Sequence, residues 1–373
     1  MIKERNIFAI ALLLMGVCAT YAQHQVVKDN RGRTMQIYIP NAEEKAGGLE
    51  VEYTDTKFYG QKNELNSAVS PIEMEDEAAA ISRLIKRVTS SLSLTYNPEV
   101  QKYIDRYVKQ GRRSTSCLLA RASYYNPFFE EALRHYGLPM ELKHLPVIES
   151  GLNPKAISGK GAAGLWQFMP TTGRQYDLQI NTFVDERLDP IKSSYAAARM
   201  LADLYNRFGD WSLALAAYNC GPGRVSNAIE KAGETADFWQ IYEFLPKETR
   251  GYVPAFIAAN YVMNYYAEYN ILPESTGLPE KAGKVVVTED ISLAKVADVL
   301  NMDIADLRML NPQYRQGIVK TIDGTATLLL PSEKVKCFTD NVSRLYENGE
   351  NSESQRLEMA ARVVKGTIHN PHS

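Results

Sequence analysis

The side chains best suited to take part in a reaction lie in the segment 138–177. One carboxylate, Glu149, directly follows the apolar run 145–148, and the turn-rich, glycine-containing stretch 159–164 comes after it. A glutamate at the end of an apolar helix loses hydrating water, which raises the pKa of its carboxyl and keeps it protonated near neutral pH. Glu149 is therefore our candidate general acid. The alternative is an ordinary surface glutamate at a helix C-terminus.

Helical patterning surrounds this segment and predicts the elements that position it. Apolar residues recur at helical spacing from 98 to 269, while proline and glycine separate the runs. We expect an all-helical domain over 89–275. The preceding residues, 23–88, predict a lead-in or linker that contains one short strand at 35–39.

A different pattern begins near residue 284. It predicts a strand, two helices and a closing strand, at 285–287, 293–300, 304–310 and 327–330. This order is that of a small α+β module of βααβ type over 284–332. The polar tail 333–373 has no assigned role and contains one helix-capable stretch at 353–363. The expected fold class is mainly α, with this small α+β module behind the helical domain.

Composition and charge narrow the class of protein. The chain has 373 residues, of which 45% are hydrophobic, as expected for about two globular domains. A formal net charge of −2 and a pI near 6.3 leave no positive surplus to neutralise phosphates, so nucleic acid is excluded as a partner. Tyrosine, with 22 residues, outnumbers the other aromatics; it suits a sugar-binding cleft and equally a tyrosine-rich helical core.

The N-terminus has the layout of a secretory signal. Basic residues precede the apolar run 7–17, and small residues then lead to a cleavage point after Ala22. The run is too short to span a bilayer, so 1–22 predicts a cleaved signal peptide. A lipid anchor at Cys18 is the less favoured alternative, because the branched Val17 stands where lipoprotein signals carry a small residue. We expect an exported protein of the periplasm or cell envelope.

The cysteines do not suggest metal or redox chemistry. Cleavage of the signal would leave Cys117, Cys220 and Cys337, which are odd in number and far apart. Neither paired cysteines nor Cys/His ligand spacing occurs in the sequence. We therefore expect no metal and no cofactor, although one disulfide remains open in an oxidising compartment.

An ordered set of motifs runs through the helical domain. They combine small and polar residues at fixed spacing: Glu-Ser-Gly-Leu-Asn-Pro at 149–154 with Ser158, Gly-Ala-Ala-Gly-Leu-Trp-Gln-Phe-Met-Pro at 161–170, Ala-Tyr-Asn at 217–219, and Glu-Thr-Arg-Gly-Tyr-Val at 248–253. Together they resemble the signature of the lytic transglycosylases of glycoside hydrolase family 23 over about 97–266. Trp166 and Asp185-Glu186-Arg187 resemble the membrane-bound lytic murein transglycosylase D branch. One motif alone would be a weak signal, whereas their order across one domain is specific.

The resemblance implies a fold and a reaction. The fold would be the goose-type, lysozyme-like helical one, and the substrate the glycan strands of peptidoglycan. The enzyme would cleave the β-1,4 bond between N-acetylmuramic acid and N-acetylglucosamine without adding water, leaving a 1,6-anhydro sugar. Glu149 would protonate the leaving oxygen and then, as carboxylate, take the proton from the attacking C6 hydroxyl.

The resemblance also implies substrate-binding roles for five residues. Ser158 would contact the acetamido or O6 region of the muramic sugar, and Gln167 would bind substrate and help to orient the acid. Tyr218 and Asn219 would form a pair in the cleft, and Tyr252 would lie near the catalytic carboxylate. The alternatives are that Ser158 only caps its loop and that Tyr218 belongs to the core.

The number of carboxylates is consistent with this reaction. Most glycosidases need two, one as acid and one as base or nucleophile, but the active-site motifs supply only one obvious candidate, Glu149. Asp185, Glu186 and Asp189 lie in a charged stretch before a proline and predict a structural turn and a helix cap. A site with one carboxylate fits a nucleophile that belongs to the substrate.

The C-terminal module resembles a lysin motif, a glycan-binding βααβ unit. Residues 288–293 stand where that motif usually carries Gly-Asp-Thr-Leu, and 307–311 fits its second helix and asparagine. The usual glycine is missing, so an unrelated small scaffold is the alternative.

Two rival functions remain open. One is a hydrolytic muramidase on the same fold, and the other is a non-catalytic peptidoglycan-binding protein. In every case the expected partner is peptidoglycan and association with the cell envelope is expected. The sequence does not set the oligomeric state, and we expect a monomer.

Overall fold

The computed structural model describes residues 77–89, 91–92, 94–233 and 237–345, and the backbone of 23–28 and 34–39. The expected signal peptide at 1–22 and the helix-capable stretch at 353–363 lie outside these residues. Within the described part, no helix has the length and apolar character that crossing a membrane requires.

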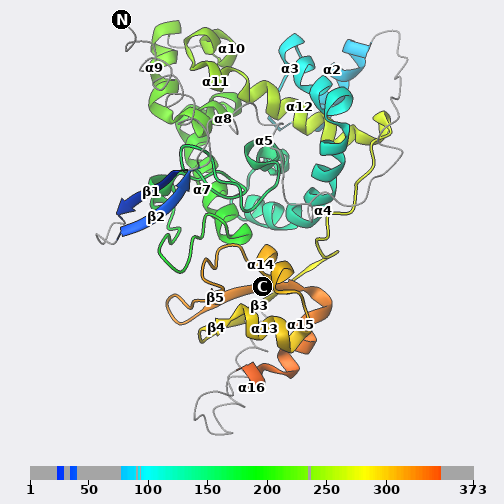
Figure 1. The fold of residues 1–373 in the computed structure, drawn as a ribbon. Coiled ribbons are helices and arrows are strands. Elements are labelled where there is room, and N and C mark those ends of the chain that lie inside the picture. Colours follow the sequence, from blue (N-terminus) through cyan, green and yellow to red (C-terminus); the bar gives the residue numbers. More distant parts are fainter. Residues whose placement is uncertain are drawn as a thin grey trace, which may run out of the picture.

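Most of the described chain forms one helical domain (Figure 1). Its α-helices are α2 (Glu77–Val88), α3 (Pro98–Asp105), α4 (Arg112–His135), α5 (Leu145–Ser150), α6 (Pro170–Gln175), α7 (Pro190–Phe208), α8 (Trp211–Cys220), α9 (Pro222–Ala232), α10 (Phe238–Ile241), α11 (Lys247–Arg250) and α12 (Tyr252–Tyr265). The intervening turns are π- or 3₁₀-helical: η4 (Arg106–Gln110), η5 (Met140–His144), η6 (Tyr242–Phe244) and η7 (Tyr266–Tyr269). Several helices begin at a proline, whose fixed φ suits the first helical position.

Helix α5 lies in the middle of this domain, ringed by α4, α7, α8 and α12 (Figure 1). Helix α12 packs against α3, α5 and α8. Its residues from Tyr252 to Met263 are almost all buried, because a helix that is apolar on every side must be enclosed by other elements. The core of the domain therefore forms directly around the helix that carries Glu149.

Part of the expected lead-in belongs to this core. Helix α2 packs against α12, and its Ile81 and Ile85 are buried in the same hydrophobic cluster. Further upstream, β1 (Gln23–Lys28) and β2 (Thr34–Ile39) pair as an antiparallel hairpin. The predicted strand at 35–39 is thus confirmed as β2, while α2 and β1 were not predicted.

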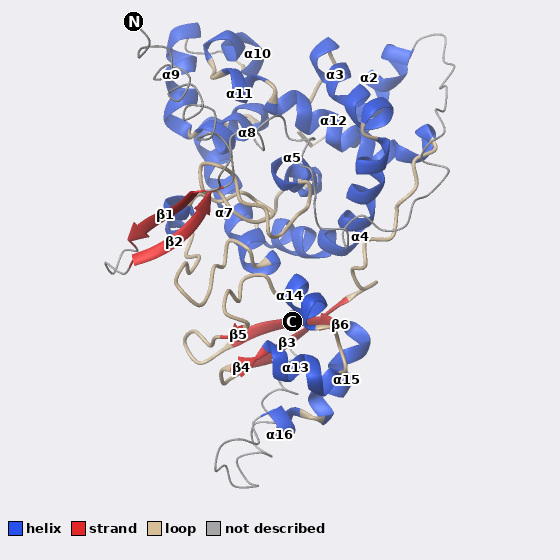
Figure 2. Ribbon diagram, viewed as in Figure 1, coloured by secondary structure: helices blue, strands red, loops and turns tan. Residues whose placement is uncertain are grey.

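The C-terminal module follows the predicted order. Figure 2 shows that the named strands of the described chain are confined to the β1–β2 hairpin and to this module. Its elements are β3 (Ala282–Val287), β4 (Ile291–Ser292), α13 (Leu293–Leu300), α14 (Ile304–Leu310), β5 (Ile318–Val319), β6 (Ala326–Pro331), α15 (Ser332–Asp340) and α16 (Val342–Leu345). Strands β3 and β6 pair antiparallel, with Ala282 opposite Pro331. The fold class is confirmed as mainly α with a small α+β module.

The beginning of the expected tail also packs onto the module. Helix α15 contacts β3 and β6, and its Phe338 is fully buried. The short β4–β5 pair was not predicted either, because strands of two residues carry no detectable period. Asn311 ties the module together: its amide donates to the carbonyls of Leu307 and Leu329, and it accepts the N–H of Leu329.

Candidate active site

Glu149 lies one residue before the end of α5, a helix of 6 residues. The helix stops there because Gly151 and Leu152 both take left-handed backbone angles, with φ of 58° and 59°, and a left-handed residue ends a helix. Leu145 and Val147 are buried in the core, whereas Glu149 is only half-buried. The helix thus presents a carboxyl group that is surrounded by protein but still accessible.

Tyr252, the first residue of α12, donates its hydroxyl hydrogen to Oε1 of Glu149. Burial raises the pKa of the Glu149 carboxyl to about 7, although the hydrogen bond from Tyr252 acts in the opposite direction. Burial, together with the nearby Glu149 charge, also raises the pKa of Tyr252 and of Tyr218 well above the usual value. Near neutral pH both forms of Glu149 are populated, so the group can give and later accept a proton.

A buried polar pair joins the start of α5 to α12. Nδ1 of His144, the residue before α5, lies 2.8 Å from Oδ1 of Asn260. Asn260 donates its amide nitrogen to the carbonyl of Phe256, which leaves its oxygen to accept from the imidazole. Burial lowers the pKa of His144 to about 4, so the ring is neutral. This pair aligns the helix of Glu149 with the helix of Tyr252.

The stretch 156–168, here called the substrate loop, contains Ser158 and Gln167. Ser158 accepts the N–H of Ala162 on its hydroxyl, at 3.0 Å. Ala163 and Phe168 exchange backbone hydrogen bonds across the loop. The capping role that the sequence left open for Ser158 is therefore present, and a substrate contact by this half-buried hydroxyl stays a prediction.

Gln167 forms hydrogen bonds within the loop. Its Nε2 donates to the carbonyls of Ala156 at 3.2 Å and Gly164 at 2.8 Å, and its backbone is left-handed, with φ of 49°. This geometry turns the amide nitrogen into the loop. Gln167 therefore acts on the shape of the loop in this structure, and its contact with substrate remains a prediction.

Tyr218 and Asn219 lie near the C-terminus of α8. The Tyr218 hydroxyl donates to the carbonyl of Trp166 at 2.8 Å, which joins α8 to the substrate loop. Asn219 is exposed, and its side-chain oxygen accepts from Thr249 at 2.9 Å. Tyr218 is half-buried and packs against the core, as the core alternative states, and its place in a sugar cleft stays a prediction.

The other carboxylates near the site have structural partners. Asp185 forms a buried ion pair with Arg187, and Glu186 pairs with Lys192 and accepts the N–H of Gln179. Asp189 caps α7 by accepting the N–H groups of the two residues after Pro190. The prediction of a structural turn and helix cap is confirmed. Burial raises the pKa of Asp189 as well, but that carboxyl is buried and occupied by the cap of α7. Glu149 is left as the accessible carboxyl with a raised pKa beside the substrate loop.

Comparison with known families agrees with this geometry. Residues 126–241 match the family model "Transglycosylase SLT domain". Residues 281–347 match "Lytic transglycosylase MltD, LysM-like domain". The chain carries an SLT domain and a LysM-like domain. The second match extends past the expected module end at 332 and includes α15 and α16.

Several known proteins are similar in sequence to part of this chain. The membrane-bound lytic murein transglycosylase D of Escherichia coli K12 is 37% identical over 195 residues, which is 51% of this chain and 43% of the relative. The soluble lytic murein transglycosylase of the same strain is 33% identical over 124 residues, which is 32% of this chain and 19% of the relative. The chain thus spans less than half the length of these relatives. The structure of the 70 kDa soluble lytic transglycosylase from E. coli covers 58% of this chain, and the chain covers 41% of it, with 21% identity and a TM-score of 0.34.

Sequence reasoning missed residues that shape the SLT site. Ser150 donates its hydroxyl to the carbonyl of Leu165 at 2.9 Å and so joins α5 to the substrate loop. His144, Asn260 and Arg187 were likewise not predicted to act there. A buried side chain that binds a distant backbone carbonyl leaves no periodic signal.

Proposed function

We propose that this protein is a peptidoglycan lytic transglycosylase in which Glu149 is both general acid and general base. The observation that carries the proposal is the pair of Glu149 and Tyr252: a half-buried carboxyl with a pKa of about 7 that receives one hydroxyl hydrogen bond. The match to the SLT domain at 126–241 supports the same reaction.

The proposed reaction begins with protonated Glu149. Its proton passes to the glycosidic oxygen as the bond between C1 of N-acetylmuramic acid and that oxygen breaks. The resulting carboxylate takes the proton of the C6 hydroxyl, whose oxygen bonds to C1 and closes the 1,6-anhydro ring. The acid is regenerated and no water enters the balance. The structural partners of Asp185, Glu186 and Asp189 support a nucleophile that comes from the sugar itself.

The remaining residues hold substrate in this proposal. Ser158, Gln167, Tyr218 and Asn219 would face the sugar from the substrate loop and from α8. Tyr252 keeps part of the Glu149 population ionised, because its hydrogen bond lowers the pKa of that carboxyl. The same proposal places the protein in the periplasm or cell envelope, after export and cleavage of 1–22, where glycan strands are its partner. One relative is named as membrane-bound.

The decisive experiment is digestion of purified murein followed by mass analysis of the products. The full-length protein should release muropeptides with anhydro ends, each lighter by one water molecule than a hydrolytic product. Glu149→Gln should lower this release by about a thousandfold, because general acid–base catalysis contributes factors of that order. Glu230→Gln, at an exposed position of α9, is the matched control and should retain full activity.

The same digest separates the rivals. Products with a reducing end and no anhydro sugar would identify a hydrolytic muramidase. If the unaltered protein binds murein but releases no products, it is a non-catalytic peptidoglycan-binding protein.

A further inference from the structure

The LysM-like domain contacts a loop of the SLT domain by main-chain pairing. Val184 and Tyr314 form an antiparallel bridge. The N–H of Asp185 donates to the carbonyl of Gln313 at 3.0 Å, and the N–H of Arg315 donates to the carbonyl of Phe183 at 2.9 Å. This pairing fixes the backbone at 183–185 to the LysM-like domain.

Val184 strengthens this contact. Its side chain is 2% exposed and lies in the hydrophobic cluster of the LysM-like domain, together with Val285 and Leu293. A residue that precedes this domain by about a hundred positions thus completes its core. Tyr314, opposite Val184, is itself anchored by a hydrogen bond from its hydroxyl to the carbonyl of Thr327.

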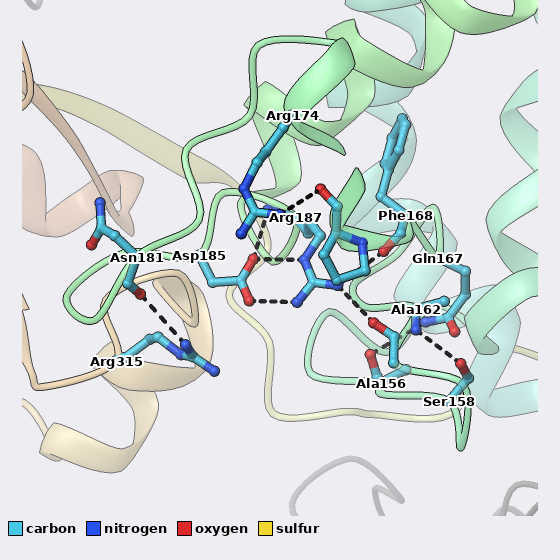
Figure 3. A network of polar contacts seen from close by, with 12 residues as sticks. Ala156, Ser158, Ala162, Gln167, Phe168, Arg174, Asn181, Asp185, Arg187 and Arg315 are labelled. Carbon is cyan, nitrogen blue, oxygen red and sulfur yellow. Dashed lines mark hydrogen bonds and ion pairs between the residues drawn. The ribbon is translucent and has the colours of Figure 1, made fainter. Parts of the chain in front are cut away.

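Asp185, the residue after Val184, is linked by hydrogen bonds through Arg187 to the substrate loop (Figure 3). The Asp185 carboxylate accepts two hydrogen bonds from the side chain of Arg187, from Nε at 2.9 Å and from Nη2 at 2.8 Å. The remaining nitrogen, Nη1, donates to the carbonyls of Gly161 at 2.7 Å and Phe168 at 3.1 Å. Both charged side chains are 2% exposed.

This arrangement depends on the shape of the guanidinium group. Its planar set of donors can bind a carboxylate on one edge and two carbonyls on the other, which a single ammonium cannot do. Gly161 and Phe168 lie on either side of the turn that contains Gln167. Arg187 therefore holds the two arms of the substrate loop at a set separation, and Asp185 sets the direction of Arg187.

We propose that the LysM-like domain positions the substrate loop of the SLT domain through Asp185 and Arg187. Arg187 is then a positioning residue, and the LysM-like domain supports catalysis whether or not it binds glycan. The role in catalysis rests on the proposed function, whereas the mechanical link between the domain and the loop does not.

The first test compares two substitutions of buried arginines in the full chain. Arg187→Lys keeps the positive charge that pairs with Asp185 but loses the planar set of guanidinium donors. Arg112→Lys is the matched control, because Arg112 is buried and donates to the carbonyls of Val108, Tyr269 and Asn270, which lie in other segments than the substrate loop. Hydrogen exchange is followed at the amides of Ala162, Ala163 and Phe168, with α12 as the reference for global stability.

Arg187→Lys should accelerate exchange at these loop amides by at least about tenfold relative to α12. The same variant should lower kcat/KM for murein by about ten- to a hundredfold, as misplaced substrate contacts do, without moving the pH at which activity falls. Arg112→Lys should change neither ratio by more than about twofold. Equal loop exchange in the two variants would overturn the proposal.

The second test addresses the LysM-like domain itself and does not depend on the folding of an arginine variant. Val184→Ala and Val285→Ala remove the same atoms from the same hydrophobic cluster. Of the two, Val184 is the one that adjoins Asp185 and is thereby connected through Arg187 to the substrate loop. Val184→Ala should accelerate exchange at Ala163 and Phe168 relative to α12, and Val285→Ala should not. If the two valine variants leave loop exchange alike, the LysM-like domain has no positioning role. Exchange is measured without substrate, so this result stands even if the chain proves not to be a transglycosylase.

Discussion

The surroundings of Glu149 and the substrate loop are built in opposite ways. Glu149 lies on helix α5, which packs against α12, and most residues of both helices are buried. The loop has little regular structure, and its shape depends on hydrogen bonds from the side chains of Ser150, Gln167, Arg187 and Tyr218 to its carbonyl groups. Non-directional packing therefore surrounds the carboxyl of Glu149, whereas directional polar bonds give the loop its shape.

This difference predicts different tolerance to substitution. Hydrophobic packing is spread over many contacts, so the pKa of Glu149 should respond only to changes that touch its own carboxyl. A loop held by few hydrogen bonds should lose its shape when a single acceptor or close approach is altered. The four predictions below test that contrast.

The largest effect is expected at Gly164, in the substrate loop. Its φ is 83°, and an added Cβ would lie 1.8 Å from the carbonyl oxygen of Arg187. Gly164→Ala should therefore destabilise the protein by about 3 kcal/mol and lower kcat/KM by about a hundredfold. Gly209→Ala is the control, because Gly209 also has a positive φ but no atom near its added Cβ. Gly209→Ala should lower the free energy of unfolding by about 1 kcal/mol and leave activity intact. Equal losses of stability and activity in the two variants would contradict a loop shape that depends on the close approach of Gly164 to the backbone of Arg187.

The second prediction concerns the stability that the folded protein loses when the Glu149 carboxyl ionises. Because the folded pKa of Glu149 is raised to about 7, its contribution to stability is fully present below about pH 4.3 and is lost as pH rises toward 7. Glu149→Gln removes this loss. It should match the unaltered protein near pH 4.5 and exceed its free energy of unfolding by about 3 kcal/mol at pH 8.

Urea unfolding of both proteins at a series of pH values measures this difference. Every other titrating group, including His144, is common to the two proteins and cancels. A stability difference that does not change with pH would mean that the carboxyl is not desolvated in the folded state.

A smaller effect is expected from Tyr252→Phe. The variant loses the hydrogen bond that lowers the pKa of Glu149, so the pKa should rise further and the alkaline limb of kcat/KM should move to higher pH. Activity at neutral pH should fall by about tenfold. Tyr218→Phe is the matched control, since its hydroxyl binds the carbonyl of Trp166 instead, and it should leave the limb in place. If the alkaline limb also shifts in the Tyr218 variant, the contact between Tyr218 and the loop contributes to the pKa of Glu149.

The smallest effect is expected from Ser158→Ala. The variant loses the acceptor for the N–H of Ala162, so the free energy of unfolding should fall by about 0.5–1 kcal/mol. If Ser158 also contacts substrate, KM should rise severalfold while the pH profile stays unchanged. A lower stability with an unchanged KM would show that Ser158 only caps its loop. Thermal unfolding and initial rates on murein measure the two quantities.

The contrast also explains what the sequence could predict. The apolar run before Glu149, the cap at Asp189 and the two helices of the module follow from local patterns, and all of them are present. The direction of the Gln167 amide depends on a left-handed backbone in the middle of a loop, which no neighbouring residue type demands. The roles of Arg187, Asn260 and α15 arise from contacts between distant segments, so local patterns could not reveal them.

The position of Val184 bears on how this architecture can be taken apart. By chain order it belongs to the SLT domain, but by packing it belongs to the hydrophobic cluster of the LysM-like domain. A fragment cut to 281–347 would leave a methyl-lined gap where Val184 inserts, and the remaining part would expose a valine to water. The two domains therefore cannot be separated cleanly: a functional transfer of either one into another protein has to include the segment 183–185 or a substitute for it.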